Sequence, residues 1–515
     1  MKHAIAHPIL AVAIAGVAAS LATTANAASC AELAKTLKLP NVTVTVAEDV
    51  PAGQFKPPGP AGLGGAPGGN FAALPAFCRV AATSRPTPDS DIRFEVWMPL
   101  EGWNGKYVGG GNGVWAGSIA YGDMVGPLVR GYATAASDVG HQGSPLDGTF
   151  LVGHPEKLTD FGHRAVHETA VAAKAAIAAY YGSGPKRSLY VSCSTGGRIG
   201  LMEAYRYPED YEGISATAPA NQMVPLMIMS LWTGAATMKD EASRIPIPKL
   251  QLVQKAALDA CDANDGMKDG IINNPPACRF DPGVLQCKAA EGADCLTAPQ
   301  VAALRAIYAG PKNPRTGKQI YPGLAVGSEA QMPALTTGQE PFPVATTFFK
   351  GPVFNDPKWD FRSFDYDKGS QRALDYGSAA LDIPPTGLDR YFKGGRKLLL
   401  SHGWADGLLP AQSTVNFYES LVKSIGKSRA QQGVRLFMAP GMAHCAGGSG
   451  PSAIDYLGAI DEWVETGKAP EKLMASNLPT QPARTRPLCP HPQVAKYTGQ
   501  GSIDEEKNFR CVAPN

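Results

Sequence analysis

Three residues of this chain have the types and the surroundings that nucleophilic catalysis needs. Ser194 lies in Ser192-Cys193-Ser194-Thr195-Gly196, after an apolar β-prone run and before a helix-compatible stretch at 199–205. A serine hydroxyl becomes a nucleophile when an imidazole takes its proton and a carboxylate holds that imidazole in the right tautomer. Asp406 and His444 each follow a further apolar β-prone run. The three side chains therefore predict a nucleophile, an orienting acid and a base.

The segment around Ser194 predicts a strand, a sharp turn and a helix, with the serine at the turn. This is the layout with which α/β-hydrolases expose a nucleophile, and their chain order of serine, acid and histidine is the order found here. Ser192 stands where the first glycine of that motif is usual, and a plain strand-to-helix turn is the alternative interpretation. His402 is a rival base, whereas we expect a structural, hydrogen-bonded role for His141.

Two cysteines stand directly beside the proposed reacting residues. Cys193 precedes Ser194, and Cys445 follows His444. If the serine touches the histidine, the Cα atoms of these neighbours come close to the roughly 4.4–6.8 Å that a disulfide requires. We therefore predict a Cys193–Cys445 disulfide that clamps the nucleophile to the base.

A glycine cluster at 109–113 follows an early β-prone run. Glycine lets a backbone turn so that its N–H groups face a ligand. In an α/β-hydrolase the loop after this strand supplies one oxyanion donor, and the residue after the nucleophile supplies the other. The candidates are Thr195 with either Gly110 or Gly111, and an ordinary loop is the alternative.

The elements that must position these residues predict an α/β fold. Strand-like runs at 132–138 and 189–193 are separated by an Ala-rich helical pattern at 163–181, and buried strands resume at 397–403 and 434–438. This order implies a parallel sheet with right-handed crossovers. We expect an α/β-hydrolase catalytic domain at 28–220 and 387–515, with residues 221–386 inserted as a lid domain.

Length and charge limit the classes of function. A chain of 515 residues exceeds one ordinary domain, which agrees with an insertion. The formal net charge is +2, from 47 basic and 45 acidic residues. It gives no electrostatic reason to expect nucleic acid or an anionic membrane as a partner. Nothing in the sequence predicts an oligomeric state.

The N-terminus predicts export. Lys2 is followed by an apolar run at 9–21 and by Ala25-Asn26-Ala27, a small-x-small cleavage site, so residues 1–27 are interpreted as a signal peptide. A membrane anchor is the alternative, but the run is too short to span a bilayer comfortably. The ten cysteines favour five disulfides, because an exported, periplasmic or extracellular protein meets an oxidising compartment. A zinc site is the alternative, but the sequence has no Cys-x-x-Cys pair.

The chain resembles the tannase and feruloyl esterase family, which includes mono(2-hydroxyethyl) terephthalate hydrolases. The resemblance rests on Cys-Ser-x-Gly-Gly-Arg at 193–198, Gly-Trp-x-Asp at 403–406 and the His-Cys pair at 444–445, and it covers the chain after residue 27. It implies that Ser194, Asp406 and His444 form the catalytic triad. It also implies that Cys193–Cys445 is the active-site disulfide. Ser192 departs from the glycine that is frequent in the family.

An Asp/Gly-rich loop at 261–271 predicts a calcium site in the lid. Its carboxylates are hard oxygen ligands that suit Ca²⁺, although the spacing is not that of an EF-hand and a solvated turn is the alternative. The resemblance implies a structural Ca²⁺ held by the side chains of Asp262, Asp265 and Asp269 and the carbonyls of Met267 and Ile271. The remaining disulfides are expected to be Cys30–Cys78, Cys261–Cys278, Cys287–Cys295 and Cys489–Cys511.

These observations and the resemblance together predict a secreted serine carboxylesterase that acts on esters of aromatic (phenolic) acids, such as gallate or ferulate esters. Phe349 and Lys350 in the lid, and Leu409 after the acid, are candidates for binding the ring. The alternative is a terephthalate monoester as substrate, weakened because no arginine clearly provides a carboxylate clamp. An alternative of another class is a non-catalytic, calcium-dependent binding module, against which the complete triad argues.

Overall fold

The computed structural model describes residue 1, residues 28–58 and residues 69–514. The predicted signal peptide, apart from Met1, and most of the Gly/Pro-rich segment at 51–69 lie outside the described residues. Within the described ranges, no helix combines the length and the apolar character needed to cross a membrane.

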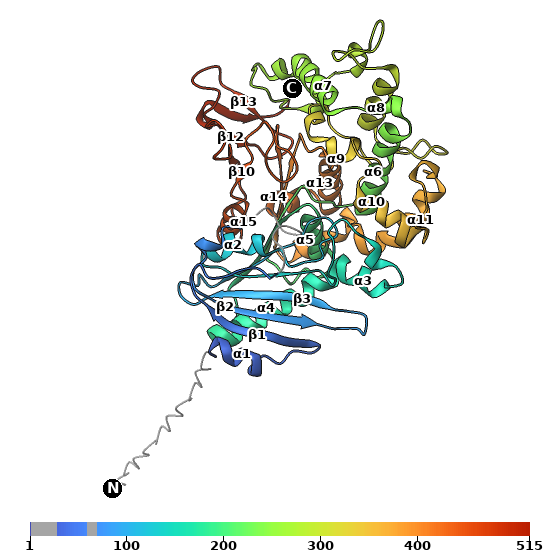
Figure 1. Ribbon diagram of the computed structural model, residues 1–515. Coiled ribbons are helices and arrows are strands. Elements are labelled where there is room, and N and C mark those ends of the chain that lie inside the picture. The colour runs from blue at the N-terminus through green and yellow to red at the C-terminus, as the bar shows by residue number, and fades with distance from the viewer. Residues whose placement is uncertain (2–27, 59–68, 515) are drawn as a thin grey trace.

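A nine-stranded sheet forms the centre of the molecule (Figure 1), with the order β1-β2-β3-β5-β4-β6-β7-β8-β9. Neighbours from β1 to β5 in this order pair antiparallel, and neighbours from β5 to β9 pair parallel. The parallel part confirms the α/β class. The strands are β1 (Val42–Val50), β2 (Phe77–Ser84), β3 (Ile92–Pro99), β4 (Lys106–Gly109), β5 (Ala133–Ser137), β6 (Arg187–Cys193), β7 (Gly213–Thr217), β8 (Lys397–Gly403) and β9 (Val434–Ala439).

Helices cover both faces of the sheet, which explains why every residue of β8 after Lys397 is buried. One face packs against α4 (Ala165–Tyr181) and α5 (Thr195–Arg206), and the other against α2 (Tyr121–Val129) and α15 (Tyr456–Thr466). The alternation is visible in β6, where Tyr190 joins the first core and Leu189 joins the core around α15. The sheet face under α4 is buried by its small alanine side chains.

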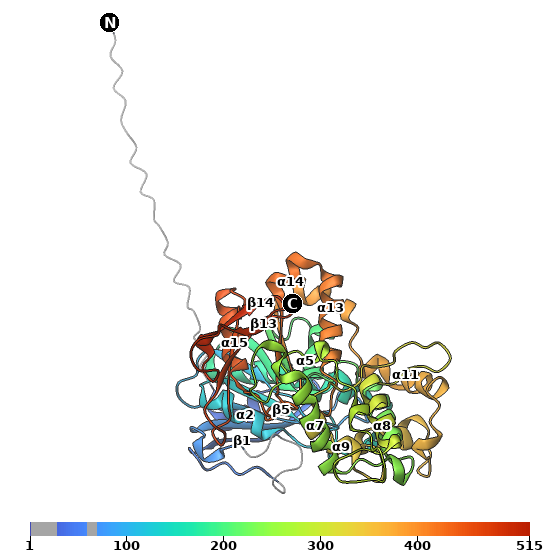
Figure 2. The same cartoon turned by 90° about the horizontal axis from the view of Figure 1, so that it is seen from above.

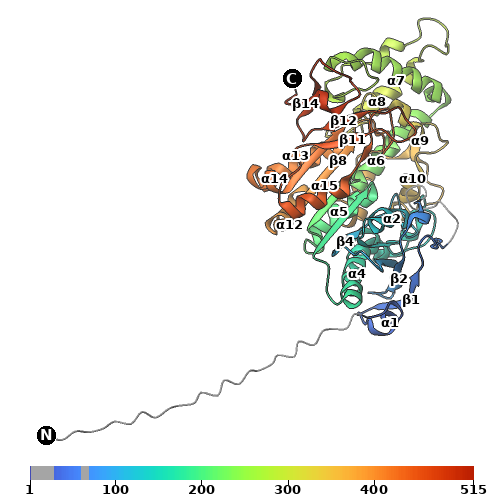
Figure 3. The same cartoon turned by 90° about the vertical axis from the view of Figure 1, so that its left-hand side faces the viewer.

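Different helices lie next to the two ends of the sheet. Figure 3 shows β1 and β2 at one end, next to α1 (Cys30–Thr36), and β8 toward the other end, near α13 (Gln412–Ile425). The helix predicted at 163–181 is α4, which begins at Ala165, directly after a π-helical turn, Asp160–Arg164. Three short helices complete the sheet's surroundings: α3 (Pro155–Thr159), α12 (Asp389–Lys393) and α14 (Lys427–Gly433).

A helical segment separates β7 from β8, at the place of the predicted lid. Its two ends meet, because the Ile383 amide donates to the Asn221 carbonyl at 2.9 Å and Gln222 bridges to Asp382. Figures 1 and 2 show its helices grouped together at one side of the molecule. The helices are α6 (Met223–Met238), α7 (Ile247–Cys261), α8 (Ala298–Ala309), α9 (Pro333–Thr336), α10 (Pro343–Phe348) and α11 (Lys368–Leu381). The geometry agrees with an insertion, and its exact domain limits stay a prediction.

Short strands near the C-terminus pack against this insertion. The Asn273 side chain donates to the Ala495 carbonyl at 3.1 Å, and Arg486 pairs with Asp269. Figure 1 shows these strands at the same end of the molecule as α7. They are β10 (Ala453–Ile454), β11 (Leu473–Ser476), β12 (Thr485–Leu488), β13 (Val494–Tyr497) and β14 (Phe509–Val512).

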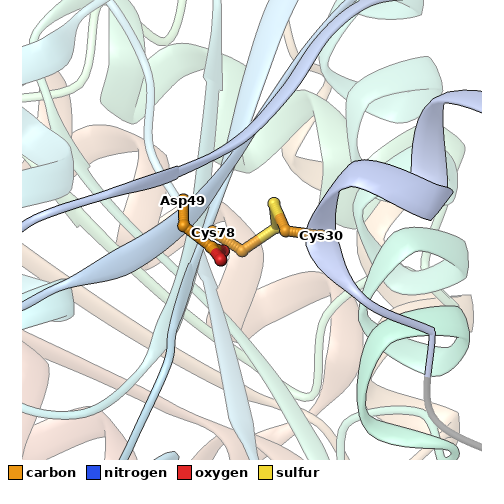
Figure 4. Close-up of side chains that lie close together, drawn as sticks. All are labelled: Cys30, Asp49 and Cys78. Carbon is orange, nitrogen blue, oxygen red and sulfur yellow. A yellow bond between two sulfur atoms is a disulfide. The ribbon is translucent and has the colours of Figure 1, made fainter.

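The structure contains the five disulfides that were expected: Cys30–Cys78, Cys193–Cys445, Cys261–Cys278, Cys287–Cys295 and Cys489–Cys511. Figure 4 shows that the first of them joins α1 to β2, with the Asp49 side chain close by. These three side chains are near enough to share a metal ion, but the two sulfur atoms are bonded to each other and are not thiolate ligands.

The Cys193–Cys445 disulfide joins residues 252 positions apart, whereas Cys287–Cys295 joins residues 8 apart. Because the entropy that a cross-link removes from the unfolded chain grows with loop length, replacing both Cys193 and Cys445 by alanine should lower the free energy of unfolding by about 2–5 kcal/mol. The Cys287→Ala/Cys295→Ala variant is the matched control and should lose less. Urea denaturation measures both, and an equal or larger loss in the control would contradict the prediction.

Candidate active site

Ser194 occupies a strained turn between β6 and α5. Its φ is 62° and its ψ is −128°, a conformation that costs a non-glycine residue on the order of 1–3 kcal/mol. The helix can start so sharply because two glycines follow. A Cβ on Gly196 would lie 2.0 Å from Ser192 Oγ, and one on Gly197 would lie 2.9 Å from the Thr217 carbonyl oxygen. The turn thus holds the Ser194 side chain out at the edge where the parallel strands end.

The structure brings Ser194, His444 and Asp406 into one hydrogen-bonded chain. Ser194 Oγ is 2.9 Å from His444 Nε2, and His444 Nδ1 is 2.7 Å from Asp406 Oδ2. A carboxylate only accepts hydrogen bonds, so Nδ1 carries the proton and Nε2 is free to accept from the serine hydroxyl. This arrangement meets the geometric requirement for an activated serine.

Asp406 is completely buried and receives four hydrogen bonds. Oδ1 accepts from the amides of Leu408 and Leu409 at 2.8 and 2.9 Å, and Oδ2 accepts from both His444 and His402. Burial alone would raise the pKa of this carboxyl. The charge of His444 and the hydrogen bonds from both histidines outweigh burial and hold the pKa of Asp406 below its usual value.

His402, the rival base of the sequence analysis, supports the acid of the triad instead. Its Nε2 donates to Asp406 Oδ2 at 3.0 Å, and its Nδ1 accepts from the Thr414 hydroxyl at 2.8 Å. It is fully buried and supports the acid, so it is not available as a base for Ser194. The sequence signal for this supporting role was the position of His402 at the end of β8, four residues before Asp406.

The pKa of His444 lies above the ordinary value of 6.5. Burial lowers this pKa, but the charge of Asp406 and its hydrogen bond raise it by more. The imidazole is therefore a stronger base than a free histidine side chain, while 20% of the side chain remains exposed toward the site.

The candidate oxyanion donors lie in two neighbouring loops. The Gly110 amide donates to the Ala135 carbonyl at 3.0 Å, so the prediction that Gly110 could be a donor is wrong. Gly111 packs directly on the nucleophile turn, since a Cβ there would lie 2.7 Å from Gly196 Cα. In the described part of the chain, the amides of Gly111 and Thr195 make no hydrogen bond. Gly111 and Thr195 therefore remain the candidates for the two oxyanion donors.

A cavity of about 730 Å³ opens in front of Ser194 and His444. This volume is in the range that small-molecule sites occupy. Much of its wall is apolar and comes from the inserted helices and from the loop after Asp406. These wall residues are Met223, Leu226, Met227, Leu335, Phe342, Val344, Ala345, Leu408 and Leu409.

Two of the three residues predicted to bind a ring do not line this cavity. Phe349 is completely buried and packs against Trp359 and Phe364 at centroid distances of 5.7 and 5.0 Å. Lys350 pairs with Glu340 at 2.8 Å. The predictions for Phe349 and Lys350 are wrong because the cavity face of α10 is formed by its first turn. Leu409 does line the cavity.

His141 has the structural role that was expected, but without the hydrogen bond. Its ring stacks on Phe150 at 3.5 Å, and neither ring nitrogen has a partner among the described residues. Burial lowers its pKa to about 4. It does not line the cavity.

The carboxylates of the Asp/Gly-rich loop accept hydrogen bonds mainly from the loop's own amides. Asp262 accepts from the amides of Asp269 and Gly270, and Asp265 accepts from the amide of Met267. One carboxylate oxygen of Asp269 is buried without a partner in the described part of the chain, as its other oxygen pairs with Arg486. Burial, followed by the charges of Asp269 and Asp262, raises the pKa of Asp265 to about 6.

This donor set fits a hard divalent cation, which would relieve the repulsion between the carboxylates. The carbonyls of Met267 and Ile271 accept no hydrogen bond from the residues that the structure describes. The three carboxylates are, however, not among the groups of the described chain whose ligand atoms all lie within 4.8 Å of one another. Binding one ion would therefore draw them closer together.

Comparison with known proteins identifies the family. The sequence profile described as tannase and feruloyl esterase matches residues 78–512. The chain is 39% identical to an uncharacterized esterase of Xanthomonas campestris pv. campestris, over 97% of this chain and 94% of the relative. It is 34% identical to the mono(2-hydroxyethyl) terephthalate hydrolase of Piscinibacter sakaiensis, over 86% of each chain. The crystal structure of feruloyl esterase B from Aspergillus oryzae superposes with a TM-score of 0.85 at 28% identity, covering 94% of this chain and 99% of that chain. This protein therefore belongs to the tannase and feruloyl esterase family.

Proposed function

We propose that this protein is a serine carboxylesterase that hydrolyses esters of phenolic acids, such as gallate or ferulate esters. The observation that carries the proposal is the hydrogen-bonded chain from Ser194 through His444 to Asp406, at 2.9 and 2.7 Å, in front of a largely apolar cavity. Membership of the tannase and feruloyl esterase family supports the reaction type and the substrate class.

In the proposed reaction, Ser194 attacks the ester carbonyl while His444 takes the hydroxyl proton at Nε2. Asp406 keeps the imidazole in the required tautomer and stabilises the imidazolium. The amides of Gly111 and Thr195 bind the oxyanion of the tetrahedral intermediate. His444 then gives its proton to the leaving alcohol, and water releases the phenolic acid from the acyl-enzyme through the same groups.

The similarity to a mono(2-hydroxyethyl) terephthalate hydrolase makes a terephthalate monoester the second candidate substrate. Such a substrate carries a free carboxylate at the far end of its acyl ring, and that carboxylate needs a cation. Among the described residues, the inserted helices contribute no lysine or arginine to the cavity wall, and Arg130, which directly follows α2, already pairs with Asp455 at 2.7 Å. Phenolic esters are therefore the preferred proposal.

Outside the catalytic site, we propose that the lid loop binds a structural Ca²⁺ through Asp262, Asp265, Asp269 and the carbonyls of Met267 and Ile271. The buried, unpaired oxygen of Asp269 and the raised pKa of Asp265 support this. We also propose that the protein is exported to the periplasm or the medium, because five disulfides form most readily in an oxidising compartment.

Replacing Ser194 by alanine should lower kcat for phenolic esters by about 10⁴- to 10⁶-fold, because the nucleophile is removed. A panel of methyl gallate, methyl ferulate, a terephthalate monoester and a short nitrophenyl ester measures this and ranks the substrates. A fluorophosphonate should label the unmodified protein and leave Ser194→Ala unlabelled. Retained hydrolysis in the variant would overturn the mechanism, and no turnover by the unmodified protein would favour a binding module.

The pH profile should report the raised pKa of His444. Only the neutral imidazole accepts the serine proton, so kcat/KM should rise with pH as His444 loses its own proton, with a midpoint above 6.5. Asp406→Asn should lower kcat by about 10⁴-fold and move the midpoint downward, because the raising charge is gone. A midpoint that is unchanged in Asp406→Asn would show that another group titrates.

Removing calcium should destabilise the protein. Adding Ca²⁺ to protein stripped with a chelator should raise the thermal unfolding midpoint, since a ligand present at about 100 times its Kd stabilises the folded state by about 2.7 kcal/mol. Mg²⁺ should not replace it, because it prefers a smaller, octahedral site. The control is Asp281→Asn, in an exposed pair with Arg305 elsewhere on the lid. It should keep the Ca²⁺ response, and Asp262→Asn/Asp265→Asn should lose it; a response retained in the latter would refute the assigned ligands.

A further inference from the structure

The loop that carries the candidate oxyanion donor Gly111 continues into a strained turn around Trp115. Val114 and Ala116, on either side of this tryptophan, have positive φ values of 49° and 64°. Such a backbone conformation costs a non-glycine residue on the order of 1–3 kcal/mol, and it persists only where the surroundings over-determine it. The contacts of Trp115 must therefore hold this turn in place.

Trp115 is completely buried, and its partners include α10 of the inserted segment. The indole Nε1 donates to the Val344 carbonyl, in the first turn of α10, at 3.0 Å. The ring packs on Phe348, also of α10, and on Phe161 of the π-helical turn, with centroids 5.9 and 5.0 Å away. The oxyanion loop is thus bonded directly to the helix whose first turn lines the cavity.

A second contact holds α10 against the same region. The Gly148 amide donates to the Thr347 hydroxyl at 2.9 Å, and a Cβ on Gly148 would lie 3.0 Å from the Trp115 ring. The Trp115 amide in turn donates to the Pro145 carbonyl at 2.9 Å. Trp115 is not among the residues that line the cavity, so these contacts act on the site through the backbone of its loop.

The residue after Gly111 anchors the same loop to the sheet. The Asn112 side chain donates to the carbonyl of Ser137, the last residue of β5, at 2.8 Å. The loop is therefore fixed to the sheet by Asn112 and to the inserted segment by Trp115. Because small displacements of a catalytic group cost large factors in rate, the effectiveness of the Gly111 amide should depend on both anchors.

We propose that Trp115 is a positioning residue through which α10 of the inserted segment holds the oxyanion donor Gly111 in place. The lid then contributes to the chemical step as well as to the binding of the aromatic ring. This inference rests on the proposed esterase function. It implies that weakening the contact between Trp115 and α10 slows even an ester whose acyl group is too small to reach α10.

The test compares methyl ferulate with 4-nitrophenyl acetate in the unmodified protein and in Trp115→Phe, which keeps an aromatic ring and removes the indole N–H. A misplacement of 1 Å can cost about 100-fold in rate, and a loosened donor should cost less, roughly tenfold. We expect kcat/KM to fall by this same factor for both esters. Inhibition by phenylboronic acid, whose tetrahedral adduct places an oxygen at the oxyanion position, should weaken equally. Inhibition by ferulate, which reports binding of the ring alone, should change less than twofold.

Trp232→Phe is the matched control. Trp232 Nε1 donates to the Ala306 carbonyl at 2.8 Å, so the variant loses the same type of bond, between α6 and α8 inside the inserted segment. It should leave all these quantities within twofold of the unmodified protein. Thr347→Val is a second variant, at a partly exposed position of α10. It removes the hydroxyl that accepts from Gly148 and should cause a smaller loss, again equal for the two esters.

Two results would overturn the inference. A loss confined to methyl ferulate, with weaker inhibition by ferulate, would show that Trp115 only shapes the wall around the ring. Unchanged kcat/KM for both esters would show that the Asn112 anchor alone fixes the loop. If Trp115→Phe loses its thermal unfolding transition, Thr347→Val decides between these results. A failure of the esterase proposal is distinct, because the unmodified protein would then hydrolyse neither ester.

Discussion

The site depends on holding two loops together that are 250 residues apart in the chain. Ser194 Oγ and His444 Nε2 must stay 2.9 Å apart, and the disulfide between the adjacent cysteines fixes the two backbones with their Cα atoms 5.9 Å apart. Both Ser194 and Cys445 have positive φ, at 62° and 65°. Two strained residues persist at one place only when the surroundings over-determine them. The disulfide, the glycines of the turn and the parallel strand edge together provide that constraint.

Asp406, the acid of the triad, is stabilised by other groups in addition to His444. A buried carboxylate is costly, and Asp406 is compensated by two backbone amides and two imidazoles. His402 and the amides keep the carboxylate charged and fixed even while His444 changes protonation state. The same charge raises the pKa of His444, so orientation and basicity of the catalytic imidazole have one origin.

The sequence was sufficient for features that depend on neighbouring residues. The order of residues along the chain predicts the triad and the strand-turn-helix around Ser194. The cysteines next to Ser194 and His444 predict the Cys193–Cys445 pairing. The sequence did not predict the features that depend on tertiary contacts, such as the choice of oxyanion donor and of ring-binding residues. Gly110 and Gly111 are indistinguishable until β4 pairs with β5 and uses the Gly110 amide. Phe349 looked like a binding residue, but the packing of α10 turns it into the core.

The topology divides the wall of the cavity between two parts of the chain. The apolar wall comes largely from the segment between β7 and β8, whose ends pair with each other at Asn221 and Ile383. The polar wall comes from α2 and α15, which pack on the sheet itself. Since the inserted segment closes on itself, its side chains can change without disturbing the strands that carry Ser194, Asp406 and His444.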